Sequence, residues 1–263
     1  MSESSVVFLL YHELEEAGHP LCQTEPGYVR YVLPVAEFRA QMELLKHEGW
    51  RGVSVGEALA FSGPERVAIT FDDGSGSDLL RAAPILREHG FGATFYITQG
   101  FLEKPGYLTS PQLMELSALG FEIGCHSKTH PYLTDLDDAG LQREIAEPKA
   151  ELEQIIGRAI EHFSCPGGRY DGRVADVARR AGYRTVATSR IQSNRRSSDP
   201  YALGRVAVLR GTGLDAFRRT CRGEGLWRMN AALHLRETSR RLLGNALYDR
   251  FRALLLRASA GTR

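Results

Sequence analysis

The chain has 263 residues, of which 43% are hydrophobic and 25% are charged, so it can fold around a substantial core and is too apolar to be intrinsically disordered. Four scattered cysteines without a C-x-x-C pair exclude a disulfide-rich scaffold and a thiolate zinc knot. The net charge of +1 is unevenly placed, because residues 218–263 hold eleven arginines against three acidic residues. We therefore expect an acidic domain at residues 1–217 and a basic, helical extension at residues 218–263.

The first segment, MSESSVVFLLYHELEE, predicts a strand and not a targeting sequence. No basic residue precedes its apolar run, and the run stops at His12 and Glu13. It is too short for a signal peptide or a membrane span. Together with the cysteine pattern, this segment predicts a cytoplasmic protein.

Short β-rich segments alternate with amphipathic helices along the rest of the chain. The predicted strands are VVFLLY, GVSV, VAITF, ATFYIT, FEIGC, HFSCP, RTVATS and LGRVAV. The predicted helices are PVAEFRAQMELLKHEGW, GEALAF, DLLRAAPILREHG, SPQLMELSALG, residues 137–156, GRVADVARRAGY and LDAFRRTC. Such alternation requires right-handed crossovers and a parallel sheet, so at this length we expect a distorted (β/α) barrel of about seven parallel strands.

Polar residues directly follow several of the predicted strands. His12 follows VVFLLY, Asp72 and Asp73 follow VAITF, His126 follows FEIGC, and the PGGRY segment follows HFSC. In a barrel, the residues after the strands meet at one end of the molecule. These features are therefore expected on a single rim.

Two of these segments together predict a hydrolytic metal site. Alone, Asp72 and Asp73 could cap a helix or face solvent, and the HSKTH sequence could be a polar loop. On a helical turn, however, His126 and His130 would share one face, and a carboxylate from a neighbouring strand end would complete a two-His, one-carboxylate set. Three protein ligands leave positions open for water and substrate. A second carboxylate would then act as the base, which explains why two aspartates are adjacent.

Three motifs, in this order, resemble the first three motifs of the polysaccharide deacetylase family, carbohydrate esterase family 4. They are TFDDG at residues 70–74, HSKTH at residues 126–130 and FSCPGG at residues 163–168, and the resemblance spans roughly residues 60–210. It implies the distorted barrel of that family, which has a NodB-homology domain. It also implies a divalent metal ion, with zinc as the first choice, that assists hydrolysis of an N-acetyl group from a sugar.

The resemblance further implies roles for single residues. Asp72 resembles the general base, and Gly167 stands where a backbone N–H helps to hold the oxyanion. The three residues that resemble the metal ligands are Asp73, His126 and His130.

The sequence departs from the family pattern on the leaving-group side. Ser164 stands where the family commonly has an arginine that orients the base, and Arg169 is the candidate to replace that arginine from the other side of the loop. We assign Arg169 and Tyr170 to substrate binding. The later tryptophan and Leu-x-His motifs of the family are not recognisable, so they do not identify the catalytic acid.

The catalytic acid is expected to be a histidine, because expulsion of an amine requires a proton near neutral pH. His12 directly follows a strand and should reach the catalytic rim. The Tyr11-His12 pair also resembles an early motif of deacetylases in exopolysaccharide synthesis. His234 is the alternative, but it lies among helix-forming residues. We therefore predict His12 as the acid.

These features predict a metal-dependent hydrolase that removes N-acetyl groups from a polysaccharide, an oligosaccharide or a lipid-linked sugar. Two alternatives use the same site, namely hydrolysis of an O-acetyl ester and hydrolysis of another non-peptide C–N bond. A third, from another class, is an inactive sugar- or membrane-binding protein, although binding alone needs no base. We expect no nucleic-acid partner, and the basic extension predicts peripheral contact with an anionic membrane, at the inner membrane surface.

Overall fold

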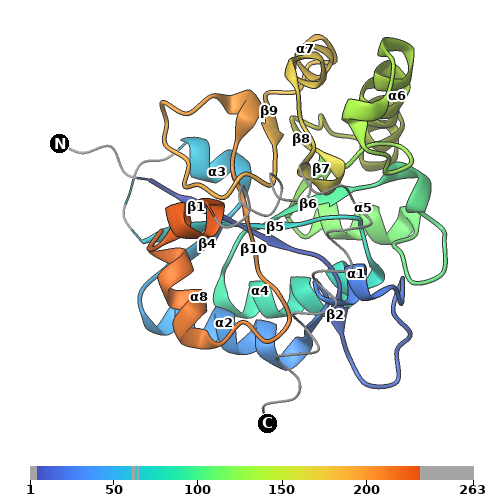
Figure 1. The fold of residues 1–263 in the computed structure, drawn as a ribbon. Coiled ribbons are helices and arrows are strands. Elements are labelled where there is room, and N and C mark those ends of the chain that lie inside the picture. The colour runs from blue at the N-terminus through green and yellow to red at the C-terminus, as the bar shows by residue number, and fades with distance from the viewer. Residues whose placement is uncertain (1–4, 61–62, 64, 232–263) are drawn as a thin grey trace, which may run out of the picture. The chain divides into compact units, whose positions relative to one another are not determined.

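Strands and helices alternate along the chain as the sequence predicts (Figure 1). The computed structural model describes residues 5–60, 63 and 65–231. The strands are β1 Val7–Tyr11, β2 Leu14–Glu15, β3 Leu33–Pro34, β4 Arg51–Val53, β5 Arg66–Phe71, β6 Thr94–Ile97, β7 Glu122–Cys125, β8 His162–Ser164, β9 Thr185–Ala187 and β10 Val206–Ala207. The helices are α1 Pro26–Val29, α2 Val35–His47, α3 Val55–Ala60, α4 Ala83–His89, α5 Ser110–Ala118, α6 Asp138–Ile156, α7 Gly172–Arg180 and α8 Leu214–Cys221.

The main sheet is parallel throughout and curls into a barrel. Its strands follow the order β10-β1-β5-β6-β7-β8-β9, and β4 pairs with β5. A parallel bridge between Ala187 of β9 and Leu203, which precedes β10, connects the two ends of this order. The predicted distorted barrel of parallel strands is therefore confirmed.

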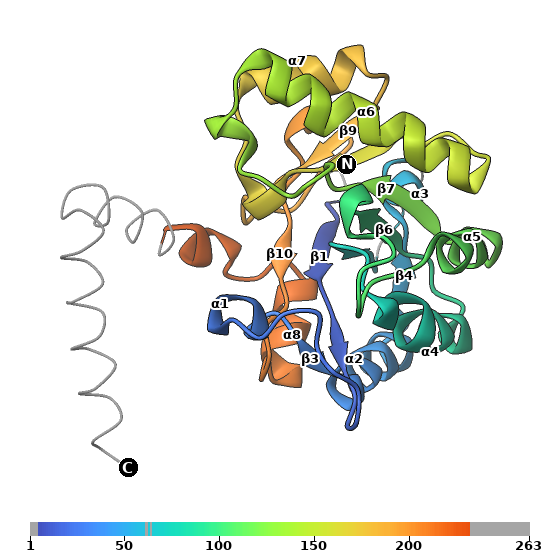
Figure 2. The same ribbon diagram turned by 90° about the vertical axis from the view of Figure 1, so that its right-hand side faces the viewer.

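Helices cover the outside of the sheet (Figure 2). Four pairs of neighbouring helices pack against each other, namely α8 with α2, α2 with α4, α5 with α6, and α6 with α7. This arrangement follows from the topology, because each helix returns the chain to the start of the next parallel strand.

The alternation of side chains along β5 directs Asp72, the residue that follows this strand, into the barrel. Phe71 packs on helix α2, where its ring lies 5.5 Å from the ring of Phe38. Successive residues of a strand face opposite sides of the sheet, so Thr70 and Asp72 face away from that helix. Both of these side chains accept hydrogen bonds from the same buried side chain, Arg205.

Contacts divide the chain into two units, residues 1–224 and residues 225–263. The predicted boundary after residue 217 falls within α8, a helix that packs against α2 and β1. Of the second unit, the structure describes residues 225–231, so most of the predicted basic extension, including His234, lies outside the described residues.

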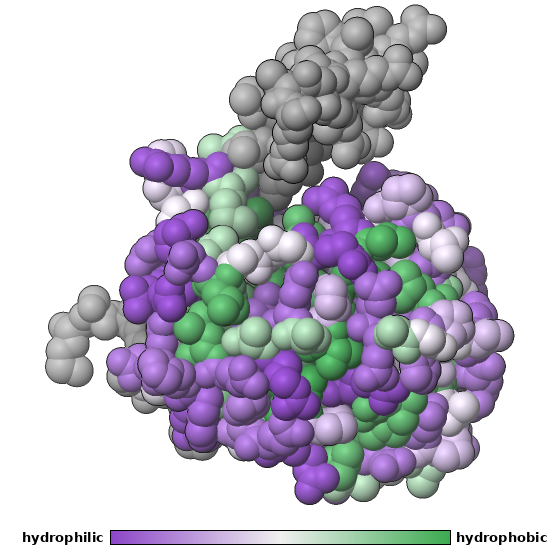
Figure 3. All heavy atoms as spheres, turned by 90° about the horizontal axis from the view of Figure 1, so that it is seen from below, coloured by the Kyte–Doolittle hydropathy of each residue, from purple (hydrophilic) through white to green (hydrophobic). Residues whose placement is uncertain are grey.

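No described helix combines the length and the apolar character required to cross a bilayer. On the face of the molecule seen from below, hydrophobic residues form separate patches divided by hydrophilic ones (Figure 3).

Candidate metal and catalytic site

Polar side chains from three strand ends meet at the carboxyl-terminal end of the barrel. His12 follows β1, Asp72 and Asp73 follow β5, and His126 follows β7. Sheet hydrogen bonding continues past the end of β5, since the N–H of Asp72 donates to the Tyr11 carbonyl oxygen at 3.0 Å. The backbone of the site is therefore held by the same hydrogen bonds that build the barrel.

Asp73, His126 and His130 form a cluster whose ligand atoms all lie within 4.8 Å of one another. The Oδ1 atom of Asp73 is 3.4 Å from Nε2 of His130 and 3.6 Å from Nε2 of His126. This oxygen is buried, and none of the described residues donates a hydrogen bond to it. A buried carboxylate oxygen without a donor, facing two imidazoles, fits a divalent cation.

A backbone contact sets the tautomer of His126. Its Nδ1 lies 2.9 Å from the carbonyl oxygen of Ser164, on the neighbouring strand β8. A carbonyl oxygen only accepts, so Nδ1 carries the proton and donates. The lone pair of Nε2 then faces both aspartates, at 3.6 Å from Oδ1 of Asp73 and 3.5 Å from Oδ2 of Asp72, and is free to bind a metal.

The two adjacent aspartates differ in their ionisation. Burial raises the pKa of the Asp73 carboxyl to about 6 and lowers the pKa of the His126 imidazole to about 3. Burial also acts to raise the pKa of Asp72, but the Arg205 guanidinium and other nearby groups outweigh it and hold this pKa well below its usual range. Asp72 is therefore ionised without a metal, whereas a bound cation would favour the ionised form of Asp73.

The loop that joins the two histidines is not the helical turn that the sequence predicted. Ser127 and His130 have positive φ values of 72° and 66°, and the N–H of His130 donates to the Ser127 hydroxyl at 2.9 Å. Glu144 of α6 accepts hydrogen bonds from the N–H groups of Lys128 and Thr129 at 3.0 and 2.8 Å. Packing against α6 therefore brings the imidazoles together, with their ring centroids 5.0 Å apart.

Asp72 forms a buried, two-pronged ion pair with Arg205, which the sequence analysis missed. The two terminal nitrogens of Arg205 lie 2.7 and 2.8 Å from Oδ1 and Oδ2 of Asp72. One of them also donates to the Ser164 hydroxyl at 2.7 Å, and this hydroxyl donates to Asp72 at 3.3 Å. Both members of the ion pair are almost fully buried, so the guanidinium fixes the orientation and charge of Asp72.

One sequence signal could have identified Arg205. It lies in the otherwise apolar segment LGRVAV, which was predicted as a strand. A charged residue in such a segment becomes buried, and arginine is almost never fully buried without an acidic partner. Its partner is 133 positions away in the sequence, so the signal predicts an ion pair and not its second member.

His12 is half-buried beside the aspartates and is not part of the metal cluster. Its ring lies 4.8 Å from the ring of Tyr31, and none of the described residues bonds its buried Nδ1 atom. Burial lowers the pKa of this imidazole, although Asp73 and Asp72 act in the opposite direction. The pairing of Tyr11 with Phe71 in β1 and β5 places His12 next to Asp72 in register. Its catalytic role stays a prediction.

Gly167 follows β8 in a conformation that favours glycine. Its φ is 60°, and a Cβ atom at this position would lie 2.7 Å from a ring carbon of Tyr132. The Tyr132 ring therefore packs directly on this backbone. The oxyanion role of Gly167 also stays a prediction.

Comparison with known proteins agrees with this geometry. Residues 62–186 match the family model for polysaccharide deacetylase. This segment belongs to the polysaccharide deacetylase family. The family assignment made from the three motifs is therefore confirmed.

Several curated relatives are similar over part of their length. The peptidoglycan-N-acetylglucosamine deacetylase of Bacillus cereus is 32% identical over 51% of this chain and 61% of its own. The chitooligosaccharide deacetylase of Azorhizobium caulinodans is 33% identical over 47% of this chain and 58% of its own. YxkH of Bacillus subtilis, provisionally named a polysaccharide deacetylase, is 29% identical over 70% of this chain and 68% of its own.

Solved structures support the fold. Streptococcus pyogenes deacetylase PplD superimposes with a TM-score of 0.73 at 20% identity, covering 84% of this chain and 99% of that chain. IcaB from Ammonifex degensii superimposes with a TM-score of 0.69 at 24% identity, covering 84% of this chain and 97% of that chain.

Arg205, and not Arg169, forms the ion pair beside the predicted base Asp72. The expectation for Arg169 is wrong, because its guanidinium lies over the Tyr132 ring at 3.8 Å and its acidic neighbour is Asp135, also at 3.8 Å. The Ser164 hydroxyl contacts both members of the Arg205–Asp72 pair, at 2.7 Å from a terminal nitrogen of Arg205 and 3.3 Å from Oδ2 of Asp72. Substrate binding by Arg169 and Tyr170 stays a prediction.

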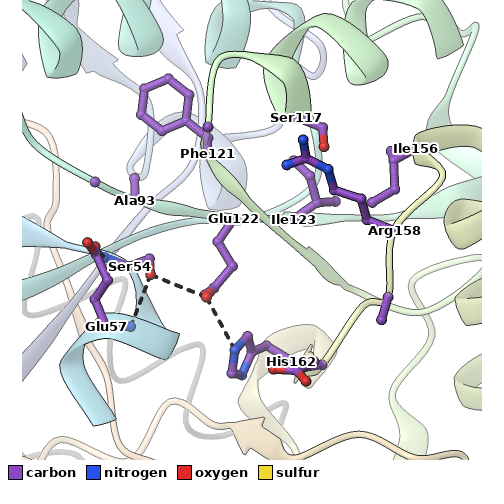
Figure 4. Close-up of a pocket in the computed structure, with 14 residues that line it drawn as sticks. Ser54, Glu57, Ala93, Ser117, Phe121, Glu122, Ile123, Ile156, Arg158 and His162 are labelled. Carbon is purple, nitrogen blue, oxygen red and sulfur yellow. Dashed lines mark hydrogen bonds and ion pairs between the residues drawn. The ribbon is translucent and has the colours of Figure 1, made fainter. Parts of the chain in front are cut away.

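A separate pocket of about 400 Å³ lies at the opposite ends of the same strands (Figure 4). Its walls include Glu122 at the start of β7 and His162 at the start of β8. The Oε2 atom of Glu122 is 3.3 Å from Nε2 of His162 and accepts a hydrogen bond from the Ser54 hydroxyl at 3.2 Å. These polar groups bond to one another and connect β7 and β8 to the residue before α3. We therefore regard the network as structural.

Proposed function

We propose that this protein is a metal-dependent carbohydrate deacetylase that hydrolyses the N-acetyl group of a sugar to acetate and a free amine. One observation carries the proposal: a three-ligand metal cluster lies beside Asp72, a buried and ionised carboxylate outside the cluster. A sugar-binding protein needs neither open metal positions nor a separate base. The names of the relatives, which include peptidoglycan and chitooligosaccharide deacetylases, support the same reaction.

The roles of the residues follow from their positions. Asp73, His126 and His130 would hold the divalent ion, for which we propose zinc, and the ion would polarise the acetyl carbonyl and activate water. Asp72 accepts a proton from the attacking water, and Arg205 keeps it ionised and oriented. The N–H of Gly167 donates a hydrogen bond to the carbonyl oxygen as it becomes negative.

Acetate release tests the proposal. The purified chain, stripped with a chelator and dialysed, should release no acetate from N-acetylated oligosaccharides, and it should regain activity when one equivalent of Zn²⁺ is added. Parallel assays with O-acetylated sugars and with ureides identify the two alternative activities. If the metal-loaded protein hydrolyses none of these substrates, the enzyme proposal fails and the binding-protein alternative gains support.

Replacement of His12 by alanine should keep the metal and remove most amide hydrolysis. An amine leaves only when it is protonated, whereas an activated aryl ester has a leaving group that needs no proton, so the ester should lose much less activity. The assay compares N-acetylated sugar and aryl acetate in His12→Ala and in His19→Ala, a surface control that pairs with Glu16. Equal losses on amide and ester would contradict the role of His12 as an acid.

We also propose that the basic segment brings the protein to an anionic membrane surface, on the inner side of the membrane. Its eleven arginines against three acidic residues motivate this proposal, since basic residues gain roughly 1 kcal/mol each near an anionic bilayer. Sedimentation with anionic vesicles should therefore exceed sedimentation with neutral vesicles at low salt and fall at high salt. Equal sedimentation with both kinds of vesicle would refute the contact.

A further inference from the structure

A single carboxylate of helix α6 holds the backbone between the two histidines of the metal cluster. Oε2 of Glu144 accepts hydrogen bonds from the N–H groups of Lys128 and Thr129, at 3.0 and 2.8 Å. The other oxygen, Oε1, accepts a hydrogen bond from the Thr129 hydroxyl at 2.7 Å. Both carboxylate oxygens are therefore bonded to the two residues that directly precede His130.

The Glu144 carboxylate depends on these donors, because its side chain is buried. Glu147 and Glu151, on the same helix, pair with the Lys128 ammonium, whereas Glu144 bonds the backbone of the loop instead. A buried carboxylate is stable only when hydrogen bonds or a cation replace its lost hydration. Hydrogen bonds from N–H groups to an ionised acceptor are also stronger than those to a neutral one. The carboxylate and the loop conformation therefore stabilise each other.

The loop has a backbone conformation that requires such support. Ser127 and His130 have φ values of 72° and 66°, which residues other than glycine rarely adopt. Such residues persist where the surrounding structure fixes them. On the side opposite α6, the N–H of Gln99 donates to the Ser127 carbonyl oxygen at 3.1 Å, and the N–H of Gly100 donates to the Lys128 carbonyl oxygen at 2.8 Å. The loop is therefore bonded on both sides, with Glu144 as its acceptor on α6.

His130 depends on this loop more than the other two ligands do. Asp73 and His126 lie just beyond β5 and β7, and the N–H of His126 donates to the Ile97 carbonyl oxygen of β6 at 2.8 Å. His130 lies at the far end of the loop, and its side chain is 34% exposed. Metal–ligand distances must be correct to about 0.2 Å. A shift of the loop that leaves the barrel intact would therefore remove His130 from the metal site.

We propose that Glu144 is a positioning residue of the metal site, which holds the loop in its metal-binding conformation before the ion binds and so raises the affinity for the ion. The inference rests on the metal site of the proposed function and adds the residue that preorganises it. Glu144 is not a member of the ligand cluster, and it acts through the backbone that carries His130. When a site is already ordered, the binding energy of the ion is not spent on ordering it.

Replacement of Glu144 by methionine should weaken zinc binding by about tenfold or more, the scale observed when residues that orient metal ligands are lost. Methionine has a similar length and cannot accept the two backbone hydrogen bonds. Glutamine can present its amide oxygen to both N–H groups and its NH₂ group to the Thr129 hydroxyl, so Glu144→Gln should recover most of the affinity. The dissociation constant is measured by competition with a chromophoric chelator, which requires no enzymatic activity.

A neighbouring glutamate on the same helix provides the control. Glu147 is exposed and bonds the Lys128 ammonium at 2.9 Å, not the backbone of the loop. Glu147→Met makes the same chemical change and should leave the zinc dissociation constant nearly unchanged, because exposed ion pairs contribute little. Circular dichroism and thermal unfolding of the metal-free proteins show whether each variant is folded. A role limited to stability would lower the unfolding temperature of Glu144→Met and leave the zinc affinity of the folded protein unchanged.

The outcomes separate this inference from the proposed function. Equal zinc affinity in the unaltered chain and in folded Glu144→Met, or equal losses in Glu144→Met and Glu147→Met, would overturn the inference and leave the metal site in place. If the unaltered chain binds no zinc, the metal site of the proposed function fails, and the inference fails with it. If Glu144→Met does not fold, Thr129→Val decides, because it removes only the bond to Oε1. This variant should bind zinc severalfold more weakly, and unchanged affinity would overturn the inference.

Discussion

Replacement of Asp72 by asparagine should leave the metal bound and lower turnover by about a hundredfold or more, the scale expected for loss of a general base. Asp72 lies outside the cluster of ligand atoms, and its ion pair with Arg205 keeps it ionised. Asparagine has nearly the same shape and cannot accept the proton. Metal content by mass spectrometry and acetate release from an N-acetylated oligosaccharide are the two measurements.

A variant of the neighbouring residue, Asp73, should differ from Asp72→Asn in its metal content. Asp73→Asn should lose both metal and activity, because Asp73 Oδ1 is the carboxylate oxygen that the cluster offers to the ion. Asp135→Asn removes an exposed carboxylate near the site and should change neither property. Loss of metal in Asp72→Asn with normal metal in Asp73→Asn would reverse the roles that we assign to the two aspartates.

Replacement of Arg205 by methionine should reduce both stability and activity strongly. The guanidinium is buried against Asp72, and removal of one member of a buried ion pair costs about 3–5 kcal/mol because it leaves an uncompensated charge. Without Arg205, burial dominates and raises the pKa of Asp72. The base must be ionised to act, so the acidic limb of the pH profile of kcat/KM should move to higher pH. Denaturant unfolding and pH-dependent acetate release measure the two effects.

A second substitution shows whether the effect of Arg205 acts through Asp72. In the double variant Arg205→Met with Asp72→Asn, the buried charge is absent, so much of the lost stability should return. Arg205→Lys keeps the charge but not the two-pronged geometry. The pH profile of this variant should therefore shift less than the pH profile of Arg205→Met. Arg169→Met removes an exposed arginine and should cost little stability. An unshifted pH profile in Arg205→Met would contradict a positioning role for Arg205.

Much of the fold and the metal cluster could be predicted from the sequence, because both depend on local patterns. Alternating strands and helices predict a parallel barrel, and a barrel brings the residues after its strands to one end. The same pattern predicts that Asp72, Asp73 and His126 lie together at that end. The structure brings the same residues together, with His130 as the third member of the metal cluster.

The tertiary structure alone decided how the site is assembled. His130 reaches the cluster through a loop with positive φ angles that Glu144 of α6 holds, and no local pattern distinguishes this loop from the predicted helical turn. Arg205 reaches Asp72 because it precedes β10, and β10 pairs with β1, which pairs with β5, so the sheet brings two segments 133 residues apart into contact. Which residues can bind a metal and accept a proton is already visible in the sequence, since these are properties of single side chains at strand ends. The partner of the base depends on the pairing of β10 with β1, which joins segments that are far apart in the sequence.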